Sequence, residues 1–306
     1  MKNTTRRSFL QSAALLSAGA MVSWSFDFKK RNPLLSFSTL GCPDWNLSMI
    51  TDFAVQHSYK GIEVRGLLRE LDLSKCKEFK TAENRKATVR LMRQKGLHFA
   101  GLGSSATLHF AAAVERQKNL DEGRRFIDLA QEIECPYVRV FPNNFPQGQD
   151  KKQTIDLISA GLQQLAEHAR GSKVSVLMET HGDLVKTADI LTIMSAAEHK
   201  HAGLVWDFCN MWSVTKEPPA EMYRQLKKYI RHTHIKDAIL INGKLQYTLL
   251  GKGEVPIIAA IEELANDHYK GYYSFEWEKL WHPEIAEPEV ALAHYPNAIR
   301  QLFNTF

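Results

Sequence analysis

The stretch that decides the fold is Ile230-Arg-His-Thr-His-Ile-Lys-Asp237 (IRHTHIKD), in a chain of 306 residues. It predicts a β-strand, and the two-residue period of a strand puts His232, His234 and Lys236 on one face. Such polar side chains cost free energy inside a protein unless they are paired, bind a metal or face a wet pocket. We therefore expect this face of the strand to belong to a functional site.

Short apolar or β-branched runs recur along the chain, and the sequences between them have the apolar spacing of helices. The strand-like runs cover residues 34–40, 61–65, 97–102, 137–141, 174–179, 203–207, 230–236 and 272–276. The helix-like stretches include 81–95, 114–134, 152–170, 187–199, 219–229, 256–268 and 289–303. This alternation predicts an α/β protein, a single-domain (β/α)8 TIM barrel over residues 32–306.

A doubly wound sheet is the alternative fold for alternating strands and helices. That fold usually has fewer strands, and a Gly-rich phosphate-binding turn often follows its first strand. Here the first run ends in Thr39-Leu40-Gly41-Cys42-Pro43, which is no such turn. The sequence therefore favours the barrel.

The composition is that of a globular protein, with 44% hydrophobic and 24% charged residues. The four cysteines, Cys42, Cys76, Cys135 and Cys209, form no C-x-x-C pair. This argues against a thiolate zinc site or a thioredoxin-like centre. We expect four buried free thiols.

The net charge of +5 comes from 39 basic and 34 acidic residues, and it is concentrated at the N-terminus. Residues 1–31 hold six Lys and Arg residues and a single acid, Asp27, so the rest of the chain is neutral. Binding to the phosphates of a nucleic acid needs clustered positive charge. The charge distribution therefore argues against a nucleic-acid partner.

Residues 1–31 are predicted to be an export signal and a short linker. Thr5-Arg6-Arg7-Ser8-Phe9-Leu10 resembles the twin-arginine export motif of bacteria, and an apolar run, 13–22, follows it. That run is too short for a permanent membrane span, and Ala18-Gly19-Ala20 suits cleavage after Ala20. We expect a periplasmic protein that meets the twin-arginine translocase during export; an uncleaved anchor is the alternative.

Acidic residues end three other predicted strands: Glu179, Asp207 and Glu276. The carboxyl ends of barrel strands meet at the catalytic rim, where a histidine of the IRHTHIKD strand joins these carboxylates. Two Glu, one Asp and one His suit Mn²⁺, Mg²⁺ or Co²⁺, and Zn²⁺ also fits. A buried salt bridge would explain any one of these residues alone, so the metal prediction depends on all four.

The chain resembles the xylose-isomerase-like TIM-barrel superfamily, the sugar phosphate isomerase and epimerase group, over about residues 34–304. The motifs that carry the resemblance are Gly61-Ile62-Glu63-Val64-Arg65, Tyr137-Val138-Arg139-Val140-Phe141, Met178-Glu179-Thr180-His181-Gly182, Trp206-Asp207, His232-Thr233-His234-Ile235-Lys236-Asp237, Leu250-Gly251-Lys252-Gly253-Glu254 and Phe275-Glu276. The resemblance implies one divalent metal ion held by Glu179, Asp207, His234 and Glu276.

Two departures limit what the resemblance implies. Some epimerases have a substrate-binding histidine three residues after the strand-six aspartate, where this chain has Asn210. The apurinic endonuclease relatives hold three metal ions with additional histidines, and those of the early strands have no evident match here. An endonuclease-like phosphodiesterase is therefore disfavoured, in agreement with the charge distribution.

The resemblance to epimerases implies that Glu179 and Glu276 are the acid and base as well as ligands. A metal on two adjacent sugar oxygens acidifies the C–H beside a carbonyl and stabilises the enediolate. Carboxylates on either side of that carbon can remove and return the proton. His181 and Lys236 are further base or oxyanion-stabilising candidates. These features predict a metal-dependent sugar isomerase or epimerase with a small carbohydrate substrate.

Four residues are candidates for substrate binding: Arg139, Asn210, His232 and Glu63. Arg139 lies in an apolar strand and could contact a substrate oxygen, but a salt bridge with a barrel carboxylate explains it equally well. For Glu63 and its neighbour Arg65 we favour pairing with charged groups at the rim.

The same first step also serves elimination, so a periplasmic lyase or hydratase acting on 3-keto-sugars or keto-glycosides is the alternative function. Export favours it, because an exported enzyme meets free sugars, oxidised sugars or glycosides and few sugar phosphates. We therefore expect a largely uncharged substrate. A non-catalytic sugar-binding barrel is a third hypothesis, and the sequence is compatible with a homo-oligomer.

Overall fold

The computed structural model describes residues 32–305. Parallel strands close into a barrel in the order β1, β10, β7, β6, β5, β4, β3 and β2. They are β1 (Leu34–Ser38), β2 (Gly61–Val64), β3 (His98–Thr107), β4 (Tyr137–Phe141), β5 (Ser175–Glu179), β6 (Ala202–Asp207), β7 (Ile230–Ile235) and β10 (Tyr272–Phe275). This topology confirms the predicted (β/α)8 barrel, and each predicted strand is present.

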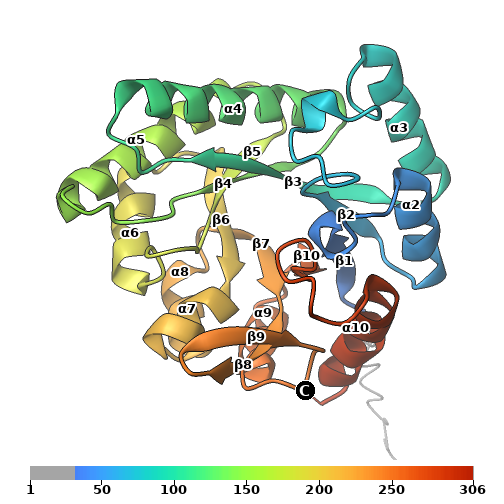
Figure 1. Cartoon of the computed structure of the whole chain (residues 1–306). Helices are drawn as coiled ribbons and strands as arrows, with labels where there is room; N and C mark the ends of the chain where they lie inside the picture. Colours follow the sequence, from blue (N-terminus) through green and yellow to red (C-terminus); the bar gives the residue numbers. More distant parts are fainter. Residues whose placement is uncertain (1–31, 306) are drawn as a thin grey trace, which may run out of the picture. The chain divides into compact units, whose positions relative to one another are not determined.

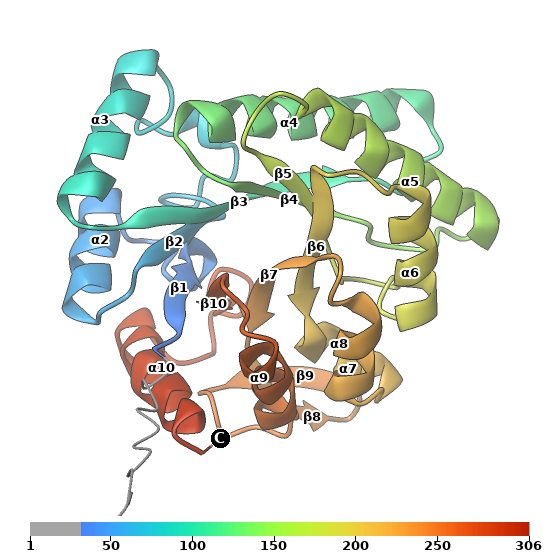
Figure 2. The same cartoon turned by 180° about the vertical axis from the view of Figure 1, so that it is seen from behind.

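Helices lie around the outside of the barrel (Figures 1 and 2). They are α2 (Leu47–Gln56), α3 (Ala82–Gln94), α4 (Ala113–Glu132), α5 (Lys151–His168), α6 (Thr187–Ala196), α7 (Phe208–Thr215), α8 (Pro219–Leu226), α9 (Ile257–Asn266) and α10 (Pro288–Phe303). Two short 3₁₀ turns are η1 (Thr39–Gly41) and η2 (Leu73–Lys75). Every helix named from the sequence pattern is present, with its ends shifted slightly.

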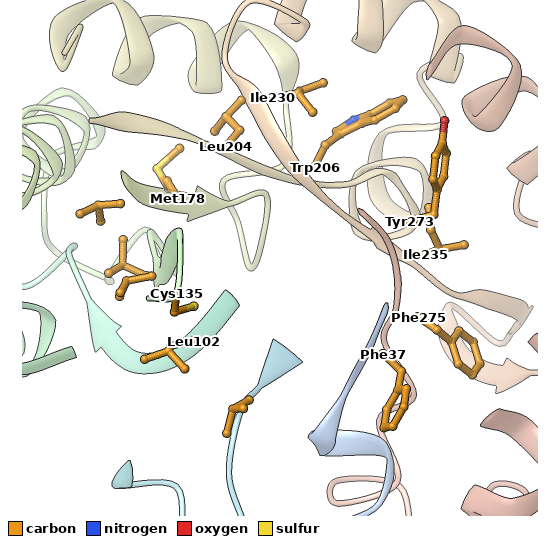
Figure 3. Packing of buried hydrophobic residues seen from close by; sticks show 14 of the residues in the cluster. Phe37, Leu102, Cys135, Met178, Leu204, Trp206, Ile230, Ile235, Tyr273 and Phe275 are labelled. Carbon is orange, nitrogen blue, oxygen red and sulfur yellow. The ribbon is translucent and has the colours of Figure 1, made fainter. Parts of the chain in front are cut away.

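The large apolar side chains of the strands form the core between the barrel and its helices (Figure 3). Phe275 of β10 stacks on Tyr295 of α10 with ring centroids 4.5 Å apart. Trp206 of β6 lies 5.4 Å from the ring of Tyr223 in α8. The apolar strand positions therefore bury their surface against the helices, which is the main stabilising contribution in such a fold.

The polar strand positions point into the barrel. Glu63 of β2 contacts His232 and His234 of β7, although β2 and β7 are not neighbours in the closed sheet. These contacts cross the barrel interior. The two-residue period of the strands thus separates an apolar outer face from a polar inner face, and the inner face can hold a site.

Some elements were not indicated by the sequence patterns: α2, α7 and a hairpin of β8 (Asp237–Ile241) and β9 (Lys244–Thr248). The hairpin turns at Asn242 and Gly243, which have φ angles of 51° and 76°. Asn-Gly is the preferred pair for such a turn, so this dipeptide was the missed signal.

The four cysteines are buried and free, as predicted. None of the helices within residues 32–305 is long and apolar enough to cross a membrane. The predicted export signal and linker, residues 1–31, lie outside the described residues.

Candidate functional site

The four predicted metal ligands meet at the carboxyl ends of their strands. Glu179 and Asp207 are the last residues of β5 and β6, His234 is near the end of β7, and Glu276 directly follows β10. One potential ligand atom from each lies within 4.8 Å of those of the others. All four side chains are buried, and Glu276 is the most exposed at 5%.

The atoms of this cluster lie close together, but their hydrogen bonds are poorly aligned. His234 Nδ1 is 3.4 Å from Glu179 Oε1 and 3.2 Å from Glu276 Oε1. Asp207 Oδ2 is 2.8 Å from the Nζ atom of Lys236. His234 Nδ1, Asp207 Oδ2 and Glu179 Oε2 nevertheless have no aligned hydrogen-bond partner. Atoms that crowd together without pairing are the arrangement expected where ligands aim at a common ion.

The electrostatics of the cluster also favour a cation. Burial would lower the pKa of His234, but the carboxylates of Glu276, Glu63 and Glu179 raise it well above its usual value. Burial raises the pKa of Asp207 to about 7, against the opposing effect of Lys236. Without an ion, protons thus reduce the negative charge. Three carboxylates are hard oxygen donors and the imidazole is a borderline donor, and together they fit a divalent metal ion.

Glu63 fixes the orientation of the candidate histidine ligand. Its Oε1 atom is 2.9 Å from His234 Nε2, and its Oε2 atom is 2.8 Å from His232 Nε2. Ser274 also donates to Oε2, at 2.9 Å. With Nε2 of His234 held by Glu63, Nδ1 faces the other ligands and can offer its lone pair to an ion once it has lost its proton. Such outer carboxylates commonly orient and strengthen metal-binding histidines.

The predicted contacts of Glu63 and His232 with a substrate stay predictions, and the structure shows what these two residues contact. Both are almost fully buried, at 2% exposure each, and both oxygens of Glu63 are already hydrogen-bonded. Glu63 does pair with other side chains, as we favoured from the sequence. Its partners are two histidines inside the barrel and not charged groups at the rim. Sequence reasoning missed this because the contact joins β2 to β7 across the interior.

Asp207 has a second role as the N-cap of α7. Its Oδ1 atom accepts a hydrogen bond of 2.8 Å from the backbone N–H of Asn210, which satisfies the first turn of the helix. Only Oδ2 is then free for an ion. The side chain of Asn210 donates to the carbonyl of Thr180 at 3.2 Å, and the residue is half-buried. Its predicted contact with a substrate stays a prediction.

Lys236 lies among carboxylates at the edge of the cluster. Its Nζ atom is 2.6 Å from Glu276 Oε2 and 2.6 Å from Glu278 Oε1. Burial would lower the pKa of Lys236, but Asp207, Glu276 and Glu278 raise it well above its usual value. The ring of Tyr247 from the hairpin is 5.5 Å from Nζ. The sequence did not point to Glu278 or Tyr247, because they belong to a loop and to the unpredicted hairpin.

The other two candidates lie on the β4–β5 side of the cluster. Arg139 Nε is 3.1 Å from Glu179 Oε2, so the salt-bridge alternative holds for this residue. His181 is half-buried, and its Nδ1 atom is 3.0 Å from Asn143 Oδ1. Burial lowers the pKa of His181, so its imidazole is neutral at pH 7. It can therefore accept a proton.

Asp237, the last residue of IRHTHIKD, organises the loop after the hairpin. Its carboxylate accepts hydrogen bonds from the backbone N–H groups of Gly251 and Gly253, at 2.8 and 2.9 Å. A Cβ on Gly253 would lie 2.1 Å from Asp237 Oδ1, so only glycine fits there. Asp237 therefore has a structural role beside the site.

A parallel eight-stranded barrel with hard metal donors at its strand ends defines the class of this protein. A family model described as "Xylose isomerase-like TIM barrel" matches residues 51–298. The chain belongs to this family. No curated protein matches the chain significantly in sequence.

Solved structures share the barrel at low sequence identity. The IolI protein with a bound zinc atom has a TM-score of 0.74 at 16% identity, over 89% of this chain and 98% of that chain. The 3-keto-D-glucoside 4-epimerase from E. coli has a TM-score of 0.68 at 15% identity, over 89% of this chain and 99% of that chain. The probable 3-DHS dehydratase of petrobactin synthesis from Bacillus anthracis has a TM-score of 0.65 at 16% identity, over 89% of this chain and 97% of that chain. At these identities the likeness establishes the fold.

Proposed function

We propose that this protein is a divalent-metal-dependent isomerase or epimerase of carbohydrates. The observation that carries the proposal is the convergence of Glu179, Asp207, His234 and Glu276 at the carboxyl end of the barrel. The carboxylates of Glu179 and Glu276 both lie beside the Nδ1 atom of His234. The family membership supports an enzyme, and an epimerase and a dehydratase are among the proteins with the same barrel.

The reaction removes a proton from the carbon beside a carbonyl. A divalent ion bound by the four ligands would supply Lewis-acid stabilisation of the enediolate. Glu179 and Glu276 stand on two sides of the cluster, so one can take the proton and the other can return it. Return to the opposite face gives epimerisation, and return to the neighbouring carbon gives isomerisation.

The surroundings of Lys236 and His181 support a different task for each. Lys236 is held protonated by its carboxylate neighbours, so it suits donation to the developing oxyanion and not proton abstraction. His181 is neutral at pH 7 and suits proton exchange with a substrate hydroxyl.

Hydrogen–deuterium exchange tests this proposal. Protein stripped of metal and protein reloaded with Mn²⁺ or Mg²⁺ would be incubated with ketoses and aldoses in D₂O, and the C–H signals followed by proton NMR. We expect exchange only in the metal-loaded protein, and its loss in Glu179→Gln and Glu276→Gln. Exchange that persists without metal, or no exchange with any carbohydrate, would overturn the proposal.

An eliminating lyase on keto-sugars is the second candidate. It is supported by the predicted export signal and by the dehydratase with the same barrel. Both reactions begin with the same proton abstraction. Incubation with a 3-keto-glucoside separates them, because a lyase releases the aglycone while an epimerase leaves the glycosidic bond intact.

We also propose that the chain is exported to the periplasm by the twin-arginine route, with cleavage after Ala20. The basis is the Arg6-Arg7 motif and the apolar run that follows it. Fractionation of cells that produce the full chain tests this. Replacement of both arginines by lysine should retain the protein in the cytoplasm, and periplasmic recovery of that variant would contradict the route.

A further inference from the structure

Two buried arginines lie side by side on the β2–β4 side of the site. Arg65 follows β2 and Arg139 lies in β4, and they are 5% and 4% exposed. Gly103 of β3 lies between them. A Cβ at Gly103 would be 2.7 Å from Arg65 Cδ and 2.9 Å from Arg139 Nη2. Glycine at this position therefore makes room for both side chains.

The two guanidinium groups have very different partners. Arg139 pairs with Glu179 and donates from Nη1 to the carbonyl of Ser104 at 2.9 Å. Arg65 donates from Nη2 to the hydroxyl of Ser105 at 3.0 Å. It forms no ion pair with any carboxylate in residues 32–305, and its Nη1 atom is buried without a hydrogen-bond partner. The expected pairing of Arg65 at the rim is therefore absent.

A buried guanidinium without a counter-ion is costly in a folded protein. Burial, together with the positive charge of Arg139, lowers the pKa of Arg65 to about 9. The carboxylates of Glu122, Glu179 and Glu276 oppose this shift without forming an ion pair with Arg65, and the group is still protonated at pH 7. Unsatisfied buried polar groups of this kind are found where a ligand completes the pairing.

We propose that Arg65, with Arg139 beside it, binds a carboxylate group of the substrate. Glu122 also acts electrostatically on Arg65, so the site lacks the excess positive charge that a phosphate dianion would need. A planar carboxylate also fits the paired N–H groups of a guanidinium. The inference rests on the proposed function, because it assumes that the substrate lies beside Glu179.

The position of the pair makes this contact geometrically reasonable. Glu179 joins the two sites, because its Oε1 atom faces His234 while its Oε2 atom faces Arg139. Arg65 is nearly buried, and Ser105, which accepts its hydrogen bond, is exposed to solvent. An acid group held there would place neighbouring sugar carbons toward Glu179. The proposal thus replaces the expected uncharged substrate with a sugar acid, an oxidised sugar that carries one negative charge.

Calorimetric binding to the metal-loaded protein tests the inference. The probes are D-glucuronate, D-galacturonate and D-gluconate, compared with D-glucose, D-galactose and glucose 6-phosphate. The variants are Arg65→Gln, which removes the charge, and Arg65→Lys, which keeps it without the planar group. Arg69→Gln is the matched control, because Arg69 is an exposed arginine paired with Asp44 outside the site.

We expect at least one sugar acid to bind about tenfold or more tightly than its neutral counterpart. Arg65→Gln should abolish that preference, Arg65→Lys should keep part of it, and Arg69→Gln should change nothing. Near-identical circular dichroism and metal content in all variants would show that they fold.

Three results would overturn the inference. They are equal binding of acids and neutral sugars, a preference that survives Arg65→Gln, and tighter binding of glucose 6-phosphate than of any carboxylate. Proton exchange with neutral sugars in the wild-type protein would then leave the proposed function intact. Conversely, Arg65-dependent binding of an acid without any proton exchange would reject the isomerase proposal and keep the carboxylate site.

Discussion

The two sides of the barrel mouth treat buried charge in opposite ways. On the side of β6, β7 and β10, a single ammonium group, that of Lys236, contacts three carboxylates. On the side of β2, β3 and β4, Arg139 pairs with Glu179, whereas Arg65 forms no ion pair within residues 32–305. An excess of negative charge attracts a cation and an excess of positive charge attracts an anion. This contrast supports the proposed metal centre on one side of the rim and the proposed carboxylate site on the other.

The total charge of the site agrees with this division. Its five carboxylates are Glu63, Glu179, Asp207, Glu276 and Glu278. Its three permanent cations are Arg65, Arg139 and Lys236, which leaves −2 with neutral histidines. One divalent ion makes the cluster neutral. The three carboxylates predicted as ligands carry −3, and the structure brings Glu63, the three cations and the unpredicted Glu278 beside them.

Loss of the histidine ligand should give the largest effect. In His234→Ala, we expect metal affinity to fall by more than about 100-fold. That is a larger loss than is typical when a residue that only orients a ligand is replaced. Metal content after dialysis measures this. His168→Ala removes an exposed imidazole paired with Asp128 and serves as the control. Full metal occupancy in His234→Ala would contradict the role of His234 as a metal ligand.

The two arginines should differ sharply in what they contribute to stability. Arg139→Met leaves the buried Glu179 carboxylate without its partner, so we expect the free energy of unfolding to fall by about 3 kcal/mol. Arg65→Met removes an unpaired charge, so the free energy of unfolding should change by less than about 1 kcal/mol or rise. Urea unfolding of the metal-free protein measures both. An equal loss in the two variants would show that Arg65 has a structural partner.

Glu63→Gln should weaken metal binding without removing any ligand. The glutamine oxygen can still accept the N–H of His234, but the negative charge that strengthens the imidazole is lost. We expect about 10- to 100-fold lower metal affinity by titration calorimetry. Ser274→Ala is the control, because Ser274 bonds only to the oxygen of Glu63 that faces away from His234. A similar loss in both variants would indicate general loosening of the interior.

Metal binding should also depend on pH, in a known direction. In the metal-free protein, the pKa of His234 is raised and that of Asp207 is about 7, so both groups hold protons near neutrality. A metal ion must displace these protons. Affinity should therefore fall as pH decreases from 8 to 6, by about tenfold per pH unit for each proton released. An affinity that is flat over this range would contradict the protonation of the empty cluster.

Lys236→Met should have the smallest effect on metal affinity. The ammonium group competes with an ion for Asp207 and Glu276, so its removal should raise affinity by up to about tenfold while proton exchange on a substrate falls. Lys228→Met, which removes an exposed lysine paired with Glu198, is the control. Weaker metal binding in Lys236→Met would mean that this lysine holds the ligands in place.

The barrel and the candidate metal cluster could be predicted from the sequence, because strand periodicity locates the strands and the polar residues at their ends. Glu179, Asp207 and Glu276 stand where predicted strands end, and strand ends meet in a parallel barrel. Within the IRHTHIKD strand, alternation placed His232 and His234 on one face, and the family resemblance selected His234. These predictions need only local sequence and the topology of the fold.

The supporting contacts could not be predicted in the same way. Glu63 reaches His234 across the interior, and the closing partner of that network, Ser274, is in a third strand. Glu278 and Tyr247 belong to a loop and a hairpin whose positions depend on tertiary packing. Arg65 and Arg139 each follow a valine in a strand-like run, so the sequence treats them alike. Their different ion pairing depends on tertiary contacts.

The most direct test of the account is a crystal structure of the protein soaked with Mn²⁺, with anomalous data collected at the manganese edge. The account predicts one anomalous peak bounded by Glu179, Asp207 Oδ2, His234 Nδ1 and Glu276. No peak in this cluster at saturating Mn²⁺, with the Lys236 ammonium remaining between Asp207 and Glu276, would contradict the metal centre and with it the proposed chemistry.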